Sequence, residues 1–106
     1  MKTILVVDDE RDILMVMRLL LRQEYRVLTA AGGEEGLAVL REQAVDLILS
    51  DQRMPGLTGI EMLKQSQQLR PEAIRILVTA YADTQTILEA INVAGIFPVH
   101  PEAMGS

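Results

Sequence analysis

Three aspartates, Asp8, Asp9 and Asp51, are the residues of this chain whose types and positions are best suited to chemistry. Asp8 and Asp9 end the apolar run 4–7, and Asp51 ends the run 47–50. If these runs are neighbouring strands, the carboxylates converge on one crevice, where each has a raised pKa unless a cation lies among them. Hard cations such as Mg²⁺ take oxygen ligands of this kind. The spacing therefore indicates a Mg²⁺ site. The alternative is that Asp8, Asp9 and Glu10 form a solvated turn and an acidic first helical turn.

A hydroxyl and a turn signal accompany these acids. Thr79 follows the apolar run 74–78, where it could donate a hydrogen bond into the same crevice. The segment 52–56, with Met54-Pro55-Gly56, is a turn signal directly after Asp51. A single strand-terminal Asp is usually a turn residue or a helix cap, and a single Thr there is usually structural. The combination is much more specific than any one of these residues.

Short apolar runs alternate with segments of helical periodicity along the chain. The predicted strands are 4–7, 25–30, 47–51, 74–79 and 96–99, and the predicted helices are 12–21, 34–43, 60–69 and 83–94. This alternation predicts right-handed crossovers and a single doubly wound α/β domain, with a parallel sheet and helices on both faces. Pro98 requires the last strand to lie at an edge.

Two predictions concern burial. The run 47–50 is typical of a strand that is buried on both faces of a parallel sheet. The first helix carries a wide apolar stripe and is expected to be well buried; the stripe comprises Ile13, Val16, Met17, Leu20 and Leu21, widened by Leu14, Met15 and Leu19.

Composition limits the possible functions. The chain has 106 residues, a formal net charge of −5 and no cysteine. The charge argues against nucleic-acid binding by this segment, and the absence of cysteine excludes disulfides and thiolate metal sites. No apolar run approaches the roughly 20 residues of a membrane span. We therefore expect no membrane association and a cytoplasmic location.

The motifs closely resemble the receiver domain of bacterial two-component response regulators. The resemblance is carried by the segments 4–10 (ILVVDDE), 47–56 (LILSDQRMPG) and 77–80 (LVTA), and it extends over about residues 2–97. It implies a receiver domain at 1–97 with a five-stranded, flavodoxin-like sheet of order 2-1-3-4-5. Residues 98–106 are then an atypical tail, of the kind that truncation or cloning leaves.

The resemblance also implies roles for individual residues. Asp51 is the expected phosphoacceptor, which takes a phosphoryl group from a sensor histidine kinase and signals to an output domain or downstream protein. Mg²⁺ is expected to bind Asp9, Asp51 and the backbone carbonyl of Arg53, with Asp8 acting through water. Thr79 is expected to hydrogen-bond the phosphoryl group, and Phe97 is the candidate aromatic switch residue. Such a chain is a switch that at most catalyses its own phosphorylation and dephosphorylation.

The sequence departs from the family near its end. Receivers carry a Lys-Pro pair after the fifth strand, whereas the lysines here are Lys2 and Lys64. His100-Pro101 aligns with that pair in one alignment, and in another nothing does; His100 is then a phosphoryl ligand or simply an exposed residue. The family's final helix has no counterpart in the sequence. We therefore expect an uncovered apolar flank of the sheet, and self-association as a homodimer or by domain swapping.

These observations leave two functions open and disfavour two others. The first is the phosphoacceptor switch. The second is a protein-interaction module that keeps the receiver fold but does not switch, because it lacks the Lys and the final helix. A Mg²⁺-dependent phosphatase is disfavoured because Arg53 stands where a second Asp is needed. A flavin-binding protein is disfavoured because no Ser/Thr/Gly-rich loop follows Val7.

Overall fold

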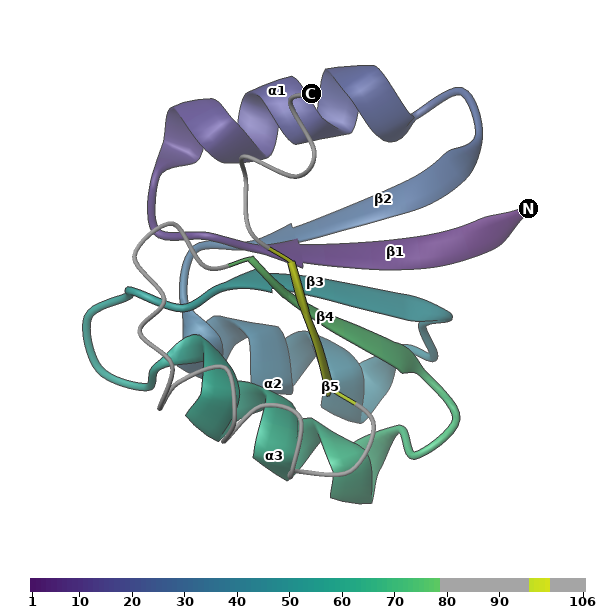
Figure 1. Ribbon diagram of the computed structural model, residues 1–106. Coiled ribbons are helices and arrows are strands. Elements are labelled where there is room, and N and C mark those ends of the chain that lie inside the picture. Colours follow the sequence, from purple (N-terminus) through teal and green to yellow (C-terminus); the bar gives the residue numbers. More distant parts are fainter. Residues whose placement is uncertain (79–95, 100–106) are drawn as a thin grey trace.

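The fold is a parallel sheet covered by helices on both faces (Figure 1), seen in a computed structural model that describes residues 1–78 and 96–99. The sheet has the order β2-β1-β3-β4-β5. Its strands are β1 (Lys2–Val7), β2 (Tyr25–Ala30), β3 (Leu47–Asp51), β4 (Ile74–Val78) and β5 (Ile96–Val99). The helices described are α1 (Arg11–Leu21), α2 (Gly33–Glu42) and α3 (Gly59–Leu69).

The predicted fold class and strand order are confirmed. β5 pairs with β4 at the edge of the sheet, where Pro98 lies opposite Leu77 without needing to donate to a further strand. The helix predicted at 83–94 and the missing final helix concern residues 79–95 and 100–106, outside the described part of the chain. Within the described part, no helix is long and apolar enough to cross a membrane.

One face of the sheet carries the dense core. Side chains alternate across a strand, and in β3 and β4 the fully buried residues Ile48 and Leu77 point to the same face. Figure 1 shows α2 and α3 on one side of the sheet, opposite α1. The core residues that these helices add are completely buried: Leu37 and Leu40 from α2, and Met62 and Leu63 from α3.

On the face that α1 covers, α1 itself and β3 are less buried than expected, which corrects two predictions. α1 has no buried residue, and Leu47 and Leu49 of β3 are only half-buried. α1 packs mainly against β2 and to a lesser extent against β1, and part of its apolar stripe is left uncovered. Large apolar side chains of α1 therefore remain exposed: Ile13, Met15, Val16, Leu19 and Leu20. We call these five residues the α1 apolar face.

Candidate metal site

The register of the sheet brings the predicted acids to one edge. Val7 at the end of β1 lies opposite Ser50 of β3. The next residue on each strand, Asp8 and Asp51, therefore falls at the same level of the carboxyl edge. The backbone N–H of Asp8 donates to the carbonyl of Ala30 at 3.1 Å, which fixes the end of β1 against β2. Parallel pairing alone thus positions the two carboxylates.

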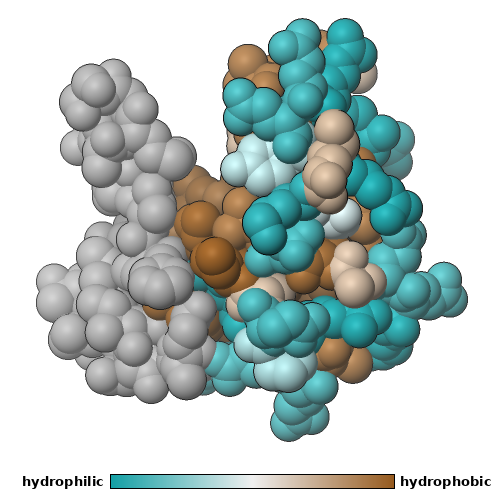
Figure 2. Space-filling view, turned by 90° about the vertical axis from the view of Figure 1, so that its right-hand side faces the viewer, coloured by the Kyte–Doolittle hydropathy of each residue, from teal (hydrophilic) through white to brown (hydrophobic). Residues whose placement is uncertain are grey.

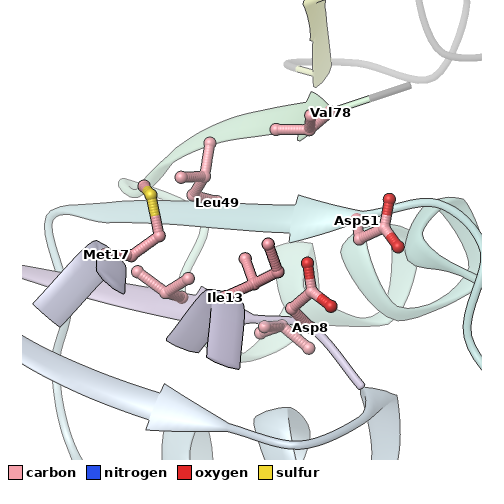
Figure 3. A pocket seen from close by; sticks show the side chains of 8 residues that line it. Asp8, Ile13, Met17, Leu49, Asp51 and Val78 are labelled. Carbon is pink, nitrogen blue, oxygen red and sulfur yellow. The ribbon is translucent and has the colours of Figure 1, made fainter. Parts of the chain in front are cut away.

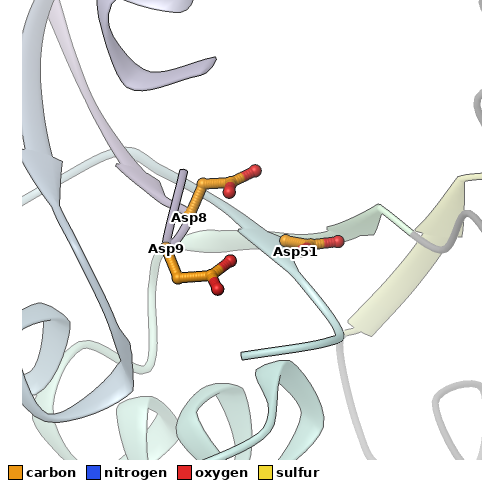
Figure 4. A group of neighbouring side chains, drawn as sticks. All are labelled: Asp8, Asp9 and Asp51. Carbon is orange, nitrogen blue, oxygen red and sulfur yellow. The ribbon is translucent and has the colours of Figure 1, made fainter. Parts of the chain in front are cut away.

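The three carboxylates form a compact group. One oxygen each of Asp8, Asp9 and Asp51 lies within 4.8 Å of the others (Figure 4). Asp8 and Asp51 are half-buried, whereas Asp9 is exposed. Three carboxylate oxygens at this spacing are the donor set that a hard divalent cation prefers, with water completing its coordination. The convergence predicted from the sequence is confirmed.

Burial and mutual repulsion disfavour the charged forms of these acids. Burial is the largest cause that raises the pKa of Asp51, and the charge of Asp8 raises it further. Burial likewise raises the pKa of Asp8, which the backbone N–H of Glu10, donating at 2.9 Å, partly opposes. The charges of Asp9 and Glu10 raise both pKa values further. A bound cation would offset this repulsion.

The loop after Asp51 is hydrogen-bonded both to β4 and to α3. The backbone N–H of Gln52 donates to the carbonyl of Val78 at 3.2 Å, and the backbone N–H of Gly59 donates to the carbonyl of Gln52 at 3.1 Å. α3 begins with a capping box, in which Thr58 and Glu61 exchange side-chain-to-backbone hydrogen bonds. The frame around Asp51 therefore consists of the ends of two strands and the first turn of a helix.

An apolar pocket adjoins the acid group. Its volume is about 220 Å³, and Asp8 and Asp51 line it together with Ile13 and Met17 of α1 and with Val6, Val7, Leu49 and Val78 of the sheet. Figure 3 shows Asp8 and Asp51 beside these apolar side chains. The pocket lies on the poorly covered face of the sheet. Its low polarity explains why burial dominates the pKa shifts of Asp8 and Asp51.

The remaining predicted site residues are only partly described. Arg53 is an exposed residue of the loop after β3, and the role of its carbonyl stays a prediction. Phe97 lies in β5 opposite Ile76, at a level below the carboxyl edge, and its side chain is not described. Thr79 and His100 lie outside the described residues.

Two residues of the frame around Asp51 were not identified from the sequence. Gly59 directly precedes the predicted helix 60–69, and a Cβ there would overlap the carbonyl oxygen of Asp51 and the side chain of Leu77. Gln52 was expected only in a turn, but its side chain accepts a hydrogen bond from the backbone N–H of Ile60 at 2.9 Å. A glycine at a predicted helix start was a usable signal for close approach, whereas nothing in the sequence indicated the contact of Gln52.

A family profile and the sequences of known proteins indicate the same family for this chain. The profile of the response regulator receiver domain matches residues 4–98. The hydrogenase transcriptional regulatory protein HoxA of Cupriavidus necator is 46% identical over 95 residues, which cover 90% of this chain and 20% of HoxA. The transcriptional regulatory protein ZraR of Escherichia coli is 37% identical over 94 residues, which cover 88% of this chain and 21% of ZraR. The chain thus spans about a fifth of the length of these curated relatives.

Solved structures show the same similarity. A CheY-like response regulator receiver domain protein from Methanospirillum hungatei superposes with a TM-score of 0.87 at 32% identity, covering 98% of this chain and 87% of that protein. The beryllofluoride-activated receiver domain of DrrB superposes with a TM-score of 0.82 at 30% identity, covering 98% of this chain and 91% of that domain.

Proposed function

Because the chain belongs to the family of response regulator receiver domains, the signalling modules of two-component systems, we propose that Asp51 accepts a phosphoryl group from a sensor histidine kinase. The observation that supports this most is the group of three carboxylates at the carboxyl edge, with oxygens within 4.8 Å of one another. Asp51 is half-buried at the end of β3, so one carboxylate faces the crevice from a fixed backbone position.

The proposed step is a phosphoryl transfer between two nucleophiles. A carboxylate oxygen of Asp51 forms a bond to phosphorus while the bond between phosphorus and the donor's imidazole nitrogen breaks. The electron pair of the broken bond returns to the imidazole, which takes up a proton from solvent, and the product is an acyl phosphate. Positioning and charge stabilisation supply most of the catalysis in such transfers. The chain modifies itself in this step and turns over no further substrate.

The donor set fits Mg²⁺, which we propose as the metal. Asp9, Asp51 and the Arg53 carbonyl would hold it directly, with Asp8 acting through water. When bound, Mg²⁺ neutralises the carboxylates and the charge on the transferred group. The raised pKa values of Asp8 and Asp51 support this assignment, since burial and neighbouring carboxylates disfavour their charged forms and a cation would offset that effect.

The signal would pass from the phosphoryl group to a partner. The added charge of about −1.5 to −2 biases a two-state element, and we propose Thr79 and Phe97 as parts of that element. HoxA and ZraR are transcriptional regulatory proteins, which supports an output domain or downstream protein that acts in transcription. Family membership likewise supports a cytoplasmic location.

Incubation with Mg²⁺ and acetyl phosphate, followed by intact-mass measurement, tests the proposal. The wild-type chain should gain the mass of one phosphoryl group, and Asp51→Asn should gain none. Asp46→Asn is a matched control, because Asp46 lies at the other end of β3, where its carboxylate accepts from the backbone N–H of Thr3 at 2.8 Å. Equal labelling of the wild type and Asp51→Asn would refute Asp51 as the acceptor. No labelling of the wild type would favour the interaction module.

A second copy of the chain is the partner we propose for the α1 apolar face. Five of the seven large apolar residues that are exposed in the described part of the chain lie on α1. Figure 2 shows apolar side chains gathered in a hollow on one face of the molecule, with hydrophilic side chains beside it. Five such side chains offer on the order of 500 Å² per copy, somewhat below the 800 Å² that is typical of a stable interface. A weak, symmetric dimer that pairs α1 with α1 is therefore expected.

A further inference from the structure

The first backbone N–H groups of α3 donate hydrogen bonds to residues that precede the helix. The first N–H groups of a helix have no partner within the helix and must find one elsewhere. The N-cap Thr58 accepts from the N–H of Glu61, as expected for a capping box. The two preceding donors both bind Gln52, because the N–H of Gly59 donates to the Gln52 backbone carbonyl and the N–H of Ile60 donates to the Gln52 side chain.

Gln52 also binds the neighbouring strand. Its own backbone N–H donates to the carbonyl of Val78, the last residue of β4. One half-buried residue directly after Asp51 therefore makes three hydrogen bonds, of 3.2, 3.1 and 2.9 Å, to two different elements. Because a backbone carbonyl and N–H serve two of these bonds, the bond through the side chain is the only one that depends on the residue being glutamine.

The side-chain bond restrains the backbone of Asp51. Gly59 lies so close to the carbonyl of Asp51 that a Cβ would not fit between them. The Gln52 amide ties the next residue of α3, Ile60, to the same short loop. α3 in turn is anchored in the core through Met62 and Leu63, which are completely buried. The position of the Asp51 backbone is thus linked to the face of the sheet that carries the dense core.

We propose that Gln52 is a positioning residue, whose side chain holds the phosphoacceptor Asp51 against α3 and β4. This inference rests on the proposed function, since it assigns Gln52 to the same site. Gln52 acts through the backbone and makes no described contact with the other acids. Its substitution should impair acceptance of the phosphoryl group more than it impairs stability, because small displacements of reacting groups lower rates strongly.

The variants Gln52→Met and Thr58→Ala provide the comparison. Gln52→Met keeps the length of the side chain but removes the acceptor for the N–H of Ile60. Thr58→Ala removes the acceptor for the N–H of Glu61 at the same helix end and leaves the three hydrogen bonds of Gln52 in place. Both variants lose one capping bond of α3, so they serve as a matched pair for stability.

Labelling by acetyl phosphate with Mg²⁺, measured at equal fraction folded, is the first readout. We expect Gln52→Met to react about tenfold more slowly than the wild type, and Thr58→Ala to stay within twofold. Amide hydrogen exchange is the second readout and requires no phosphodonor: the amides of Asp51 and Ile60 should exchange faster in Gln52→Met but not in Thr58→Ala.

The outcomes separate this inference from the proposed function. If the wild type reacts and the two variants react equally fast, Gln52 is merely a helix cap and the inference is wrong. If the wild type does not react, the proposed function fails. The exchange of the Asp51 amide then decides whether Gln52 restrains this position, and unchanged exchange in Gln52→Met would overturn the inference.

Discussion

The charged groups at the two edges of the sheet have different surroundings. At the amino edge, Arg75 is 3% exposed, and its guanidinium donates to Ser66 Oγ and to the carbonyls of Ala73 and Arg70. Burial lowers its pKa, but its hydrogen bonds are provided by the protein itself. At the carboxyl edge, burial raises the pKa values of Asp8 and Asp51, and the charges of the neighbouring carboxylates raise them further.

This difference distinguishes charged groups that stabilise the fold from charged groups that we propose bind a ligand. A buried charge that the protein satisfies internally contributes to folding, because its loss leaves carbonyl groups without donors. A group of like charges left without a counterion destabilises the fold, and it persists where a ligand supplies the missing charge. The amino edge therefore contributes to stability, whereas we propose that the carboxyl edge binds a cation. Three changes test this contrast, and a fourth tests the proposed dimer.

Arg75→Met should produce the largest loss of stability. It removes donors from the carbonyls of Ala73 and Arg70, and we expect the free energy of unfolding to fall by about 2 kcal/mol. Denaturant titration measures the loss. The control Arg26→Met removes an exposed bond to Gln43 and should cost less than about 0.5 kcal/mol. Equal effects of the two substitutions would show that the amino edge is not a specific stabilising network.

Mg²⁺ should stabilise the carboxyl edge. At a concentration of ten times the dissociation constant, one bound ion raises the free energy of unfolding by about 1.4 kcal/mol. Thermal unfolding at increasing Mg²⁺ measures the effect, and Asp9→Asn should greatly reduce it. Glu24→Gln, away from the carboxyl edge in the turn between α1 and β2, is the control. An equal increase in Asp9→Asn would indicate binding elsewhere.

Stability should decrease as pH rises through the raised pKa values of Asp8 and Asp51. Between their ordinary value of 3.8 and these raised values, the folded chain binds more protons than the unfolded chain, so the free energy of unfolding falls with pH. Asp51→Asn should weaken this dependence and stabilise the metal-free chain at neutral pH, by at most about 1 kcal/mol because solvent screens the charges. A variant less stable than the wild type at pH 7 would contradict this expectation.

Leu20→Lys should have the smallest effect on stability. Leu20 is 71% exposed on the α1 apolar face, so the free energy of unfolding should change by less than about 0.5 kcal/mol. Light scattering at high micromolar concentration should show that self-association of the wild type is lost in the variant. A monomeric wild type would refute the proposed dimer.

The fold could be predicted from the sequence because each strand and helix is indicated by the residues of its own short segment. Runs such as Ile4–Val7 and Leu47–Ser50 are too short for helices, and their alternation with amphipathic segments allows few topologies. The burial of α1 did not follow, because an apolar stripe shows which side of a helix avoids water but not whether another element covers it. The described elements cover little of that stripe.

The acid group was predictable for a similar reason. Asp8 directly follows β1 and Asp51 ends β3, so the parallel pairing of these strands brings the two residues together. The frame around them was not predictable, because the bond between Gln52 and Ile60 spans eight residues of an irregular loop. Neither periodicity nor turn signals determine such a contact, whereas the strand ends required only the pairing of β1 with β3.

The most direct test of the account is the rate of phosphoryl labelling by acetyl phosphate across a titration with Mg²⁺. The carboxyl edge is proposed to need one hard cation before Asp51 can accept the phosphoryl group. We expect a rate that rises and saturates with Mg²⁺, with a midpoint equal to the dissociation constant obtained from thermal unfolding. Labelling of Asp51 that proceeds equally fast in the presence of a chelator would contradict it.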